Sequence, residues 1–89
     1  MSAAYIACKV FRGLFETEYY VTVNGSSAYY VNRANVRVNR APEGQDGVDG
    51  KVLGYVVQKK DDKTLVQLSG EAALGGLRTW VENSALSVA

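Results

Sequence analysis

The chain has no histidine, one cysteine and one proline among its 89 residues. Histidine is the commonest metal ligand and general base near neutral pH, so its absence removes the usual start for either kind of site. The single thiol, Cys8, leaves zinc without enough ligands and precludes an intrachain disulfide. A free cysteine between apolar neighbours is typical of a reducing compartment. We therefore expect a soluble cytoplasmic protein with no metal and no cofactor.

Long apolar runs and a strong charge of one sign are also absent. No apolar run approaches the roughly 18 residues of a membrane span, and the first residues lack the charged and apolar regions of an export signal. Residues 1–42 carry five basic and two acidic side chains, and residues 43–89 carry five and seven, for a net charge of +1. We expect no membrane partner, and a nucleic-acid site would depend on a local patch.

Alternating apolar and polar residues predict strands through most of the chain. Ala4–Phe11 places Ile6, Cys8 and Val10 on one face, with Tyr5 and Phe11 on the other. The other predicted strands are Glu18–Val23, the run up to Val31, Asn35–Asn39, Lys51–Val57, Thr64–Leu68, Leu77–Val81 and a last strand holding Leu86 and Val88. We expect one all-β domain over residues 1–89.

Asn24-Gly25 marks a hairpin because both residues tolerate the positive φ of a type I′ turn. A two-residue loop pairs Tyr20 with Tyr29 and Tyr19 with Tyr30, whereas a loop widened to Asn24–Ser27 shifts that register. Cross-strand aromatic pairs stabilise a ribbon by roughly 0.2 to 1 kcal/mol each relative to alanine pairs.

Four segments between the strands are predicted as connections. Lys59–Lys63 reads as a charged hairpin loop, and Glu82–Leu86 has room for one helical turn. Ala41–Gly50 holds the proline and three glycines and is expected not to pair in a sheet. Ser69–Gly76 is predicted to be a plain loop because glycines flank its short helical stretch.

Tyr29–Arg37, Ala41-Pro42, Lys51–Gly54 and Thr79–Ser87 together resemble the bacterial SH3 domain pattern. That family has an Asn-Val-Arg strand, a Gly-Pro-rich loop and a Trp-Val pair before a helical turn. The resemblance implies an SH3-like small barrel of five to seven short antiparallel strands, with one helical turn before the last strand.

Gly50–Tyr55 and the ending Ala85–Ala89 are similar in spacing to the type II dihydrofolate reductase, a tetrameric SH3-like barrel. This second resemblance implies a homo-oligomer. The pore strand of that enzyme reads Val-Gln-Ile-Tyr, and the matching Leu77–Trp80 lacks the glutamine, so its activity is not carried over.

No set of side chains dictates a chemistry, and we predict no catalytic residue. Glu16 and Glu18 share a strand face without a nucleophile, histidine or metal ligand beside them. We therefore expect a binding or assembly module that recognises protein or peptide through aromatic side chains. The candidate groove residues are Tyr19, Tyr20, Tyr29, Tyr30, Tyr55 and Trp80.

Two alternatives remain open. Arg33, Arg37 and Arg40 follow one another with no acidic residue between Val31 and Pro42, and they form a candidate nucleic-acid contact. Small barrels also leave exposed sheet edges, which favour pairing with a second chain. A homo-oligomer is thus a further expectation.

Overall fold

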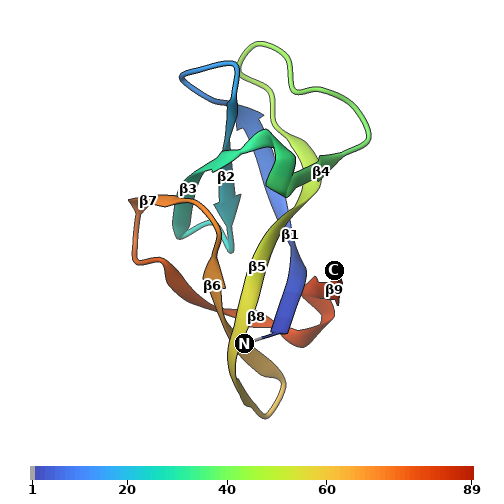
Figure 1. Ribbon diagram of the computed structural model, residues 1–89, viewed down its shortest axis with the longest axis vertical. Coiled ribbons are helices and arrows are strands. Elements are labelled where there is room, and N and C mark those ends of the chain that lie inside the picture. The colour runs from blue at the N-terminus through green and yellow to red at the C-terminus, as the bar shows by residue number, and fades with distance from the viewer. Residues whose placement is uncertain (1) are drawn as a thin grey trace.

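The computed structural model describes residues 2–89 as one antiparallel sheet that curls into a half-barrel (Figure 1). The strands are β1 Ser2–Arg12, β2 Glu18–Val23, β3 Ser27–Asn32, β4 Val36–Val38, β5 Val48–Lys60, β6 Lys63–Leu68, β7 Glu71–Leu74, β8 Arg78–Glu82 and β9 Leu86–Val88. Two single-turn 3₁₀ helices, η1 Arg33–Asn35 and η2 Asn83–Ala85, precede β4 and β9. The all-β prediction is confirmed.

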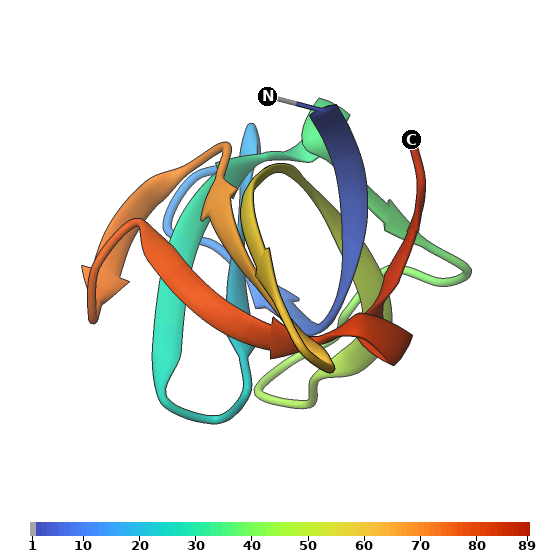
Figure 2. The same ribbon diagram turned by 90° about the horizontal axis from the view of Figure 1, so that it is seen from below.

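The sheet runs in the order β7, β3, β2, β1, β5, β6, β8, with β4 pairing to β5 and β9 to β1. Seen along the curl in Figure 2, the strands wrap around one interior. The longest ladder joins Ser2–Val10 of β1 to Val48–Val56 of β5. Alternate side chains of both strands therefore point into the same core.

The core consists mainly of valine. Ile6, Val10 and Val52 are fully buried at the β1–β5 ladder, and Val21 and Val66 meet them from β2 and β6. Branched side chains of this kind suit a pleated, half-buried surface. The predicted inward face of β1 is confirmed for Ile6 and Val10, and Cys8 packs partly buried against the same cluster.

Gly54 allows β5 to pack closely against its neighbours. A Cβ atom at this position would lie 2.6 Å from Cδ1 of Ile6 and 2.9 Å from the carbonyl oxygen of Gln67. Both distances are shorter than carbon and oxygen atoms tolerate. The glycine is thus needed here for close approach rather than for a turn.

Within residues 2–89, the continuous path of the sheet has seven strands, the upper end of the predicted five to seven, and the short strands β4 and β9 pair beside it. Glu71–Leu74, predicted to lie in a loop, is strand β7 and pairs with β3. β5 begins at Val48, so the end of the Ala41–Gly50 segment pairs in the sheet, contrary to expectation. In both cases tertiary pairing overrides the local glycines.

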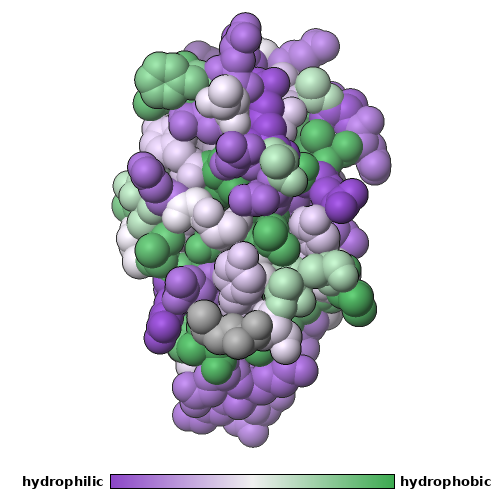
Figure 3. Space-filling model, in the orientation of Figure 1, coloured by the Kyte–Doolittle hydropathy of each residue, from purple (hydrophilic) through white to green (hydrophobic). Residues whose placement is uncertain are grey.

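Two of the connections between strands match the predictions made from the sequence. The helical turn before the last strand is confirmed as η2. The charged hairpin is confirmed at Asp61-Asp62, between β5 and β6, and the surface at that lower end of the molecule is hydrophilic (Figure 3).

The Asn-Gly turn is confirmed, but the two-residue loop is wrong. Asn24 and Gly25 both have positive φ, and the Ser26 amide donates to the Val23 carbonyl at 3.4 Å. Ser26 remains outside the ladder, so Val23 pairs with Ser27 and every later pair shifts by one residue. Tyr20 therefore faces Tyr30 rather than Tyr29, and the loop of three residues, Asn24–Ser26, lies between the two predicted loop lengths.

No helix within residues 2–89 is long and apolar enough to cross a membrane. Within the same residues, no group of three or more acidic or cysteine side chains is placed to hold a metal ion.

Candidate binding site

The six aromatic residues predicted to form a groove do not lie together. Tyr29 is fully buried and Tyr19 is only 8% exposed, so both belong to the core. The Tyr29 hydroxyl donates to the Gly76 carbonyl at 2.7 Å. Burial raises the pKa of Tyr29, and a hydrogen bond with the Ser27 side chain partly opposes that shift. In this conformation, neither ring is available to a partner.

The one-residue register shift explains this division. Tyr29 faces Val21 on the inner side of the ribbon, and Tyr30 faces Tyr20 on the outer side. Successive strand residues point to opposite faces, so a change of one residue in the loop decides which tyrosines share a face.

An outer aromatic row crosses three adjacent strands. It consists of Phe11 on β1, Tyr20 on β2 and Tyr30 on β3, which are directly opposite one another in the ladders. The Phe11 and Tyr20 ring centroids are 6.2 Å apart, and those of Tyr20 and Tyr30 are 5.2 Å apart. All three are half-buried, so each side chain remains partly exposed to solvent. Phe11 was placed outward from its strand pattern but was not included in the predicted groove.

Tyr55 and Trp80 lie outside this row. Tyr55 is on β5 opposite Gln67, and Trp80 is on β8 opposite Leu65. Trp80 is 38% exposed, yet no aromatic pair within residues 2–89 connects it or Tyr55 to the row. The structure thus brings together two of the six predicted residues, Tyr20 and Tyr30, and adds Phe11.

A hollow of about 310 Å³, here called the acidic hollow, opens beside Tyr30. Its lining comes from the start of β2, the end of β3 and the turn into β7: Thr17, Glu18, Tyr30, Asn32, Ser69, Gly70 and Glu71. Glu18 and Glu71 are its charged side chains, and no basic residue lines it. This hollow is therefore suited to a cationic group.

Strand β7 forms one end of the sheet. It pairs with β3 and with no other strand in the described part of the chain. All four of its residues are exposed, with Leu74 at 59%. An edge strand presents unpaired amide and carbonyl groups, which is the template that an added strand uses. Glu71 faces Tyr30 in the ladder, so this edge continues the aromatic row.

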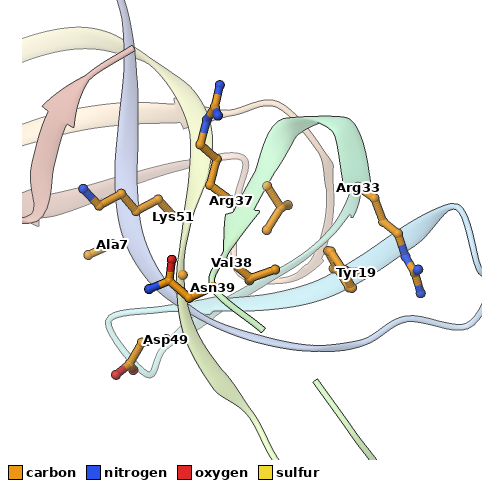
Figure 4. Close-up of a pocket in the computed structure, with 10 residues that line it drawn as sticks. Ala7, Tyr19, Arg33, Arg37, Val38, Asn39, Asp49 and Lys51 are labelled. Carbon is orange, nitrogen blue, oxygen red and sulfur yellow. The ribbon is translucent and has the colours of Figure 1, made fainter. Parts of the chain in front are cut away.

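A larger hollow of about 850 Å³, here called the basic hollow, surrounds the short strand β4 (Figure 4). In the figure, Arg33 and Tyr19 lie to one side of β4, and Lys51, Asn39 and Asp49 lie to the other. Arg33 and Arg37 of the predicted arginine set line this hollow, but Arg40 does not. Lys51 takes the third basic position, and the sequence pattern did not single it out because it comes from a different strand.

Arg33, Arg37 and Lys51 have no carboxylate partner within residues 2–89. The one ion pair in these residues joins Lys9 to Asp49 at 3.0 Å. The Arg33 guanidinium instead lies 4.5 Å from the Tyr19 ring centroid. That of Arg37 lies 5.0 Å from the Tyr5 ring centroid. Lys51 donates to the Ser87 hydroxyl at 3.2 Å. Arg37 and Lys51 are directly opposite in the β4–β5 ladder, where like charges oppose folding.

No protein-family model matches the chain, and no curated protein or solved structure matches it either. The fold is a small all-β half-barrel, compatible with the barrel that both resemblances imply, and membership in either family is not established.

Proposed function

We propose that this protein is a non-enzymatic binding module that recognises an extended segment of another protein. The supporting observation is the outer aromatic row, which ends at the unpaired edge of β7. A segment that paired with β7 would place its outward side chains next to Glu71, with Tyr30 one strand farther in on β3. Backbone hydrogen bonds to the edge would supply affinity, and the row would select side chains.

The chemistry of the preferred segment follows from the charges around the row. Glu18 and Glu71 line the acidic hollow beside Tyr30, with no basic side chain to neutralise them there. A lysine or arginine entering this hollow would approach the Glu71 carboxylate and the Glu18 carboxylate, which also accepts from the Leu14 amide at 3.3 Å. The cation would also approach the ring of Tyr30. Cation–π contact of this kind is worth roughly 0.5 to 1 kcal/mol at exposed sites. The favoured segment is therefore extended, apolar and basic.

We further propose that the half-barrel has an SH3-like arrangement of strands and that the protein is cytoplasmic. The helical turn η2 before β9 supports the SH3-like arrangement. The unpaired thiol of Cys8, partly buried against the core, supports a reducing compartment.

Selection from a displayed peptide library tests the proposal, with the intact chain as bait. We expect the selected peptides to be extended and to carry a basic residue among apolar ones. Titration calorimetry with one such synthetic peptide should then give an affinity that falls by about two- to fivefold in Tyr30→Ala, since losing about 0.5 to 1 kcal/mol costs that factor. Glu71→Gln should weaken binding to a smaller degree and reduce the preference for the basic residue.

Tyr55→Ala is the matched control, because this half-buried tyrosine lies outside the row. It should leave the affinity unchanged. Equal losses in Tyr30→Ala and Tyr55→Ala, or peptides that bind Tyr30→Ala as well as the native chain, would remove the row as the contact surface. A second copy on β7 is the competing occupant, and light scattering that gives a dimer would favour it instead.

A further inference from the structure

We infer that the basic hollow binds the backbone of a single-stranded nucleic acid, on a surface separate from the aromatic row. The inference depends on Arg33, Arg37 and Lys51, which η1, β4 and β5 bring into one hollow. It is independent of the proposed protein contact.

The basic hollow carries positive charge that its own lining does not neutralise. Within residues 2–89, none of the three cations has a carboxylate within ion-pair distance, and the one acidic residue of the lining, Asp49, is paired with Lys9. The direct opposition of Arg37 and Lys51 is unfavourable to the fold by itself. A bound anion between them would turn this repulsion into attraction.

The hydrogen-bond donors of the basic hollow indicate which type of anion it would bind. Phosphate and sugar oxygens are bound in proteins by arginine and lysine together with amide and hydroxyl donors. The basic hollow offers the Asn39 amide in its lining, beside the two arginines and Lys51. Phosphate oxygens therefore match the available donors.

Two guanidinium groups of the basic hollow stack on aromatic rings. Arg33 lies over the ring of Tyr19 and Arg37 over that of Tyr5, so each guanidinium has one face against an aromatic ring. Arg33 Nε also donates to the Glu18 carbonyl at 3.5 Å, so the other N–H groups and the opposite face of each guanidinium are what a ligand would contact. Unpaired bases stack on arginine planes while the backbone contacts the charges, which an acidic peptide has no means to do.

The shape of the basic hollow favours a flexible ligand. The lining lies on both sides of β4, so a ligand that reaches all three cations must bend around a strand of three residues (Figure 4). Duplex DNA is stiff over about 50 nm and resists such a bend. A single strand follows it easily.

Fluorescence anisotropy with a labelled oligothymidine tests the inference, using a strand that fills a site of about 4 to 16 nucleotides. Three phosphate contacts on single-stranded DNA give a slope of log affinity against log salt near −2. The affinity should therefore fall by roughly 15-fold between about 50 and about 200 mM salt. Arg37→Ala and Lys51→Gln should each reduce the slope by about 0.7 and weaken binding severalfold.

Lys51→Gln separates a binding role from a structural one. Removing this charge relieves its opposition to Arg37, so the urea midpoint should stay equal or rise while oligonucleotide affinity falls. Lys60→Ala is the control, because it removes the same charge from the exposed hairpin end of β5, far along the strand from Lys51. It should change affinity and slope little.

Several results would overturn the inference. Absence of binding at low salt, equal binding of duplex and single strand, or equal losses in Lys60→Ala and Lys51→Gln would each do so. An oligoglutamate peptide or anionic phospholipid vesicles that bind when oligothymidine does not would assign the basic hollow to another polyanion. None of these results bears on Tyr30, so failure here is distinguishable from failure of the proposed function.

Discussion

At the scale of single residues, the position of a side chain on the ribbon decides its role more than its type does. Tyr29 and Tyr30 are neighbours of identical chemistry. The former is in the core with its hydroxyl bonded to Gly76, and the latter is half-exposed in the outer aromatic row. The one-residue offset at Ser26 produces this difference. A function assigned to tyrosines as a group therefore divides once the register is known.

Cys8 provides a prediction of pH dependence. Burial, and secondarily the Asp49 charge, raise the pKa of this thiol from 9.0 to about 12. The raised pKa means that the folded state retains the proton, so its contribution to stability is complete below pH 9 and is lost as the pH rises toward 12. At about pH 10 the loss should be of the order of 1 kcal/mol.

Urea unfolding of the native chain and of Cys8→Ala at several alkaline pH values measures this effect. The difference between the two isolates the thiol, because Tyr29 titrates in both. The native chain should lose its advantage steadily above pH 9. Asp49→Asn should retain most of that slope, since burial is the larger cause. Parallel curves for the native chain and Cys8→Ala would show that the thiol titrates normally.

At the scale of elements, close approach between strands sets the requirement at Gly54. A methyl group there would meet Ile6 and the Gln67 carbonyl at less than 3 Å. Gly54→Ala should therefore destabilise the fold by about 1 to 3 kcal/mol, as overpacking of a core does. Chemical denaturation monitored through Trp80 fluorescence measures this change.

Gly76→Ala is the comparison for Gly54→Ala. Its φ is not positive, and the nearest non-adjacent atom to an added Cβ would be 3.9 Å away. The stability should then stay within about 0.5 kcal/mol of the native value. If Gly54→Ala and Gly76→Ala change the stability equally, close packing between the strands is not the reason that position 54 requires glycine.

The elements that the sequence predicts well are those with a local signal. Alternation marks β1, the Asn-Gly pair marks the β2–β3 turn, and the charged run marks the β5–β6 hairpin. Strand β7 lacks such a signal, because Glu71–Leu74 is flanked by glycines and becomes a strand through its pairing with β3. The sequence therefore predicts where most of the strands form, but it does not predict which strands pair or in which register they pair.

The residues of the two candidate surfaces were also predicted only where they are close in the sequence. Arg33 and Arg37 are near in sequence and were found together, but Lys51 joins them through the β4–β5 ladder. Glu18 and Glu71 are far apart in sequence and meet in the acidic hollow because β3 pairs with both β2 and β7. Contacts between distant segments carry no local pattern, so a single sequence does not reveal them.

At the scale of the whole molecule, a nearly neutral chain separates its charges into two hollows. The acidic hollow adjoins the aromatic row and the β7 edge, and the basic hollow surrounds β4. The net charge of +1 conceals this separation. We therefore propose two binding surfaces of opposite charge on this small half-barrel, and the principal one consists of the β7 edge and the outer aromatic row.

Amide hydrogen exchange at β7, followed by NMR with and without a selected peptide, tests this principal surface most directly. Strand addition predicts that the amides of Glu71–Leu74 that do not bond to β3 become strongly protected when the peptide binds, while the amides of β4 keep their free exchange rates. Unchanged exchange throughout β7 at saturating peptide would contradict the account.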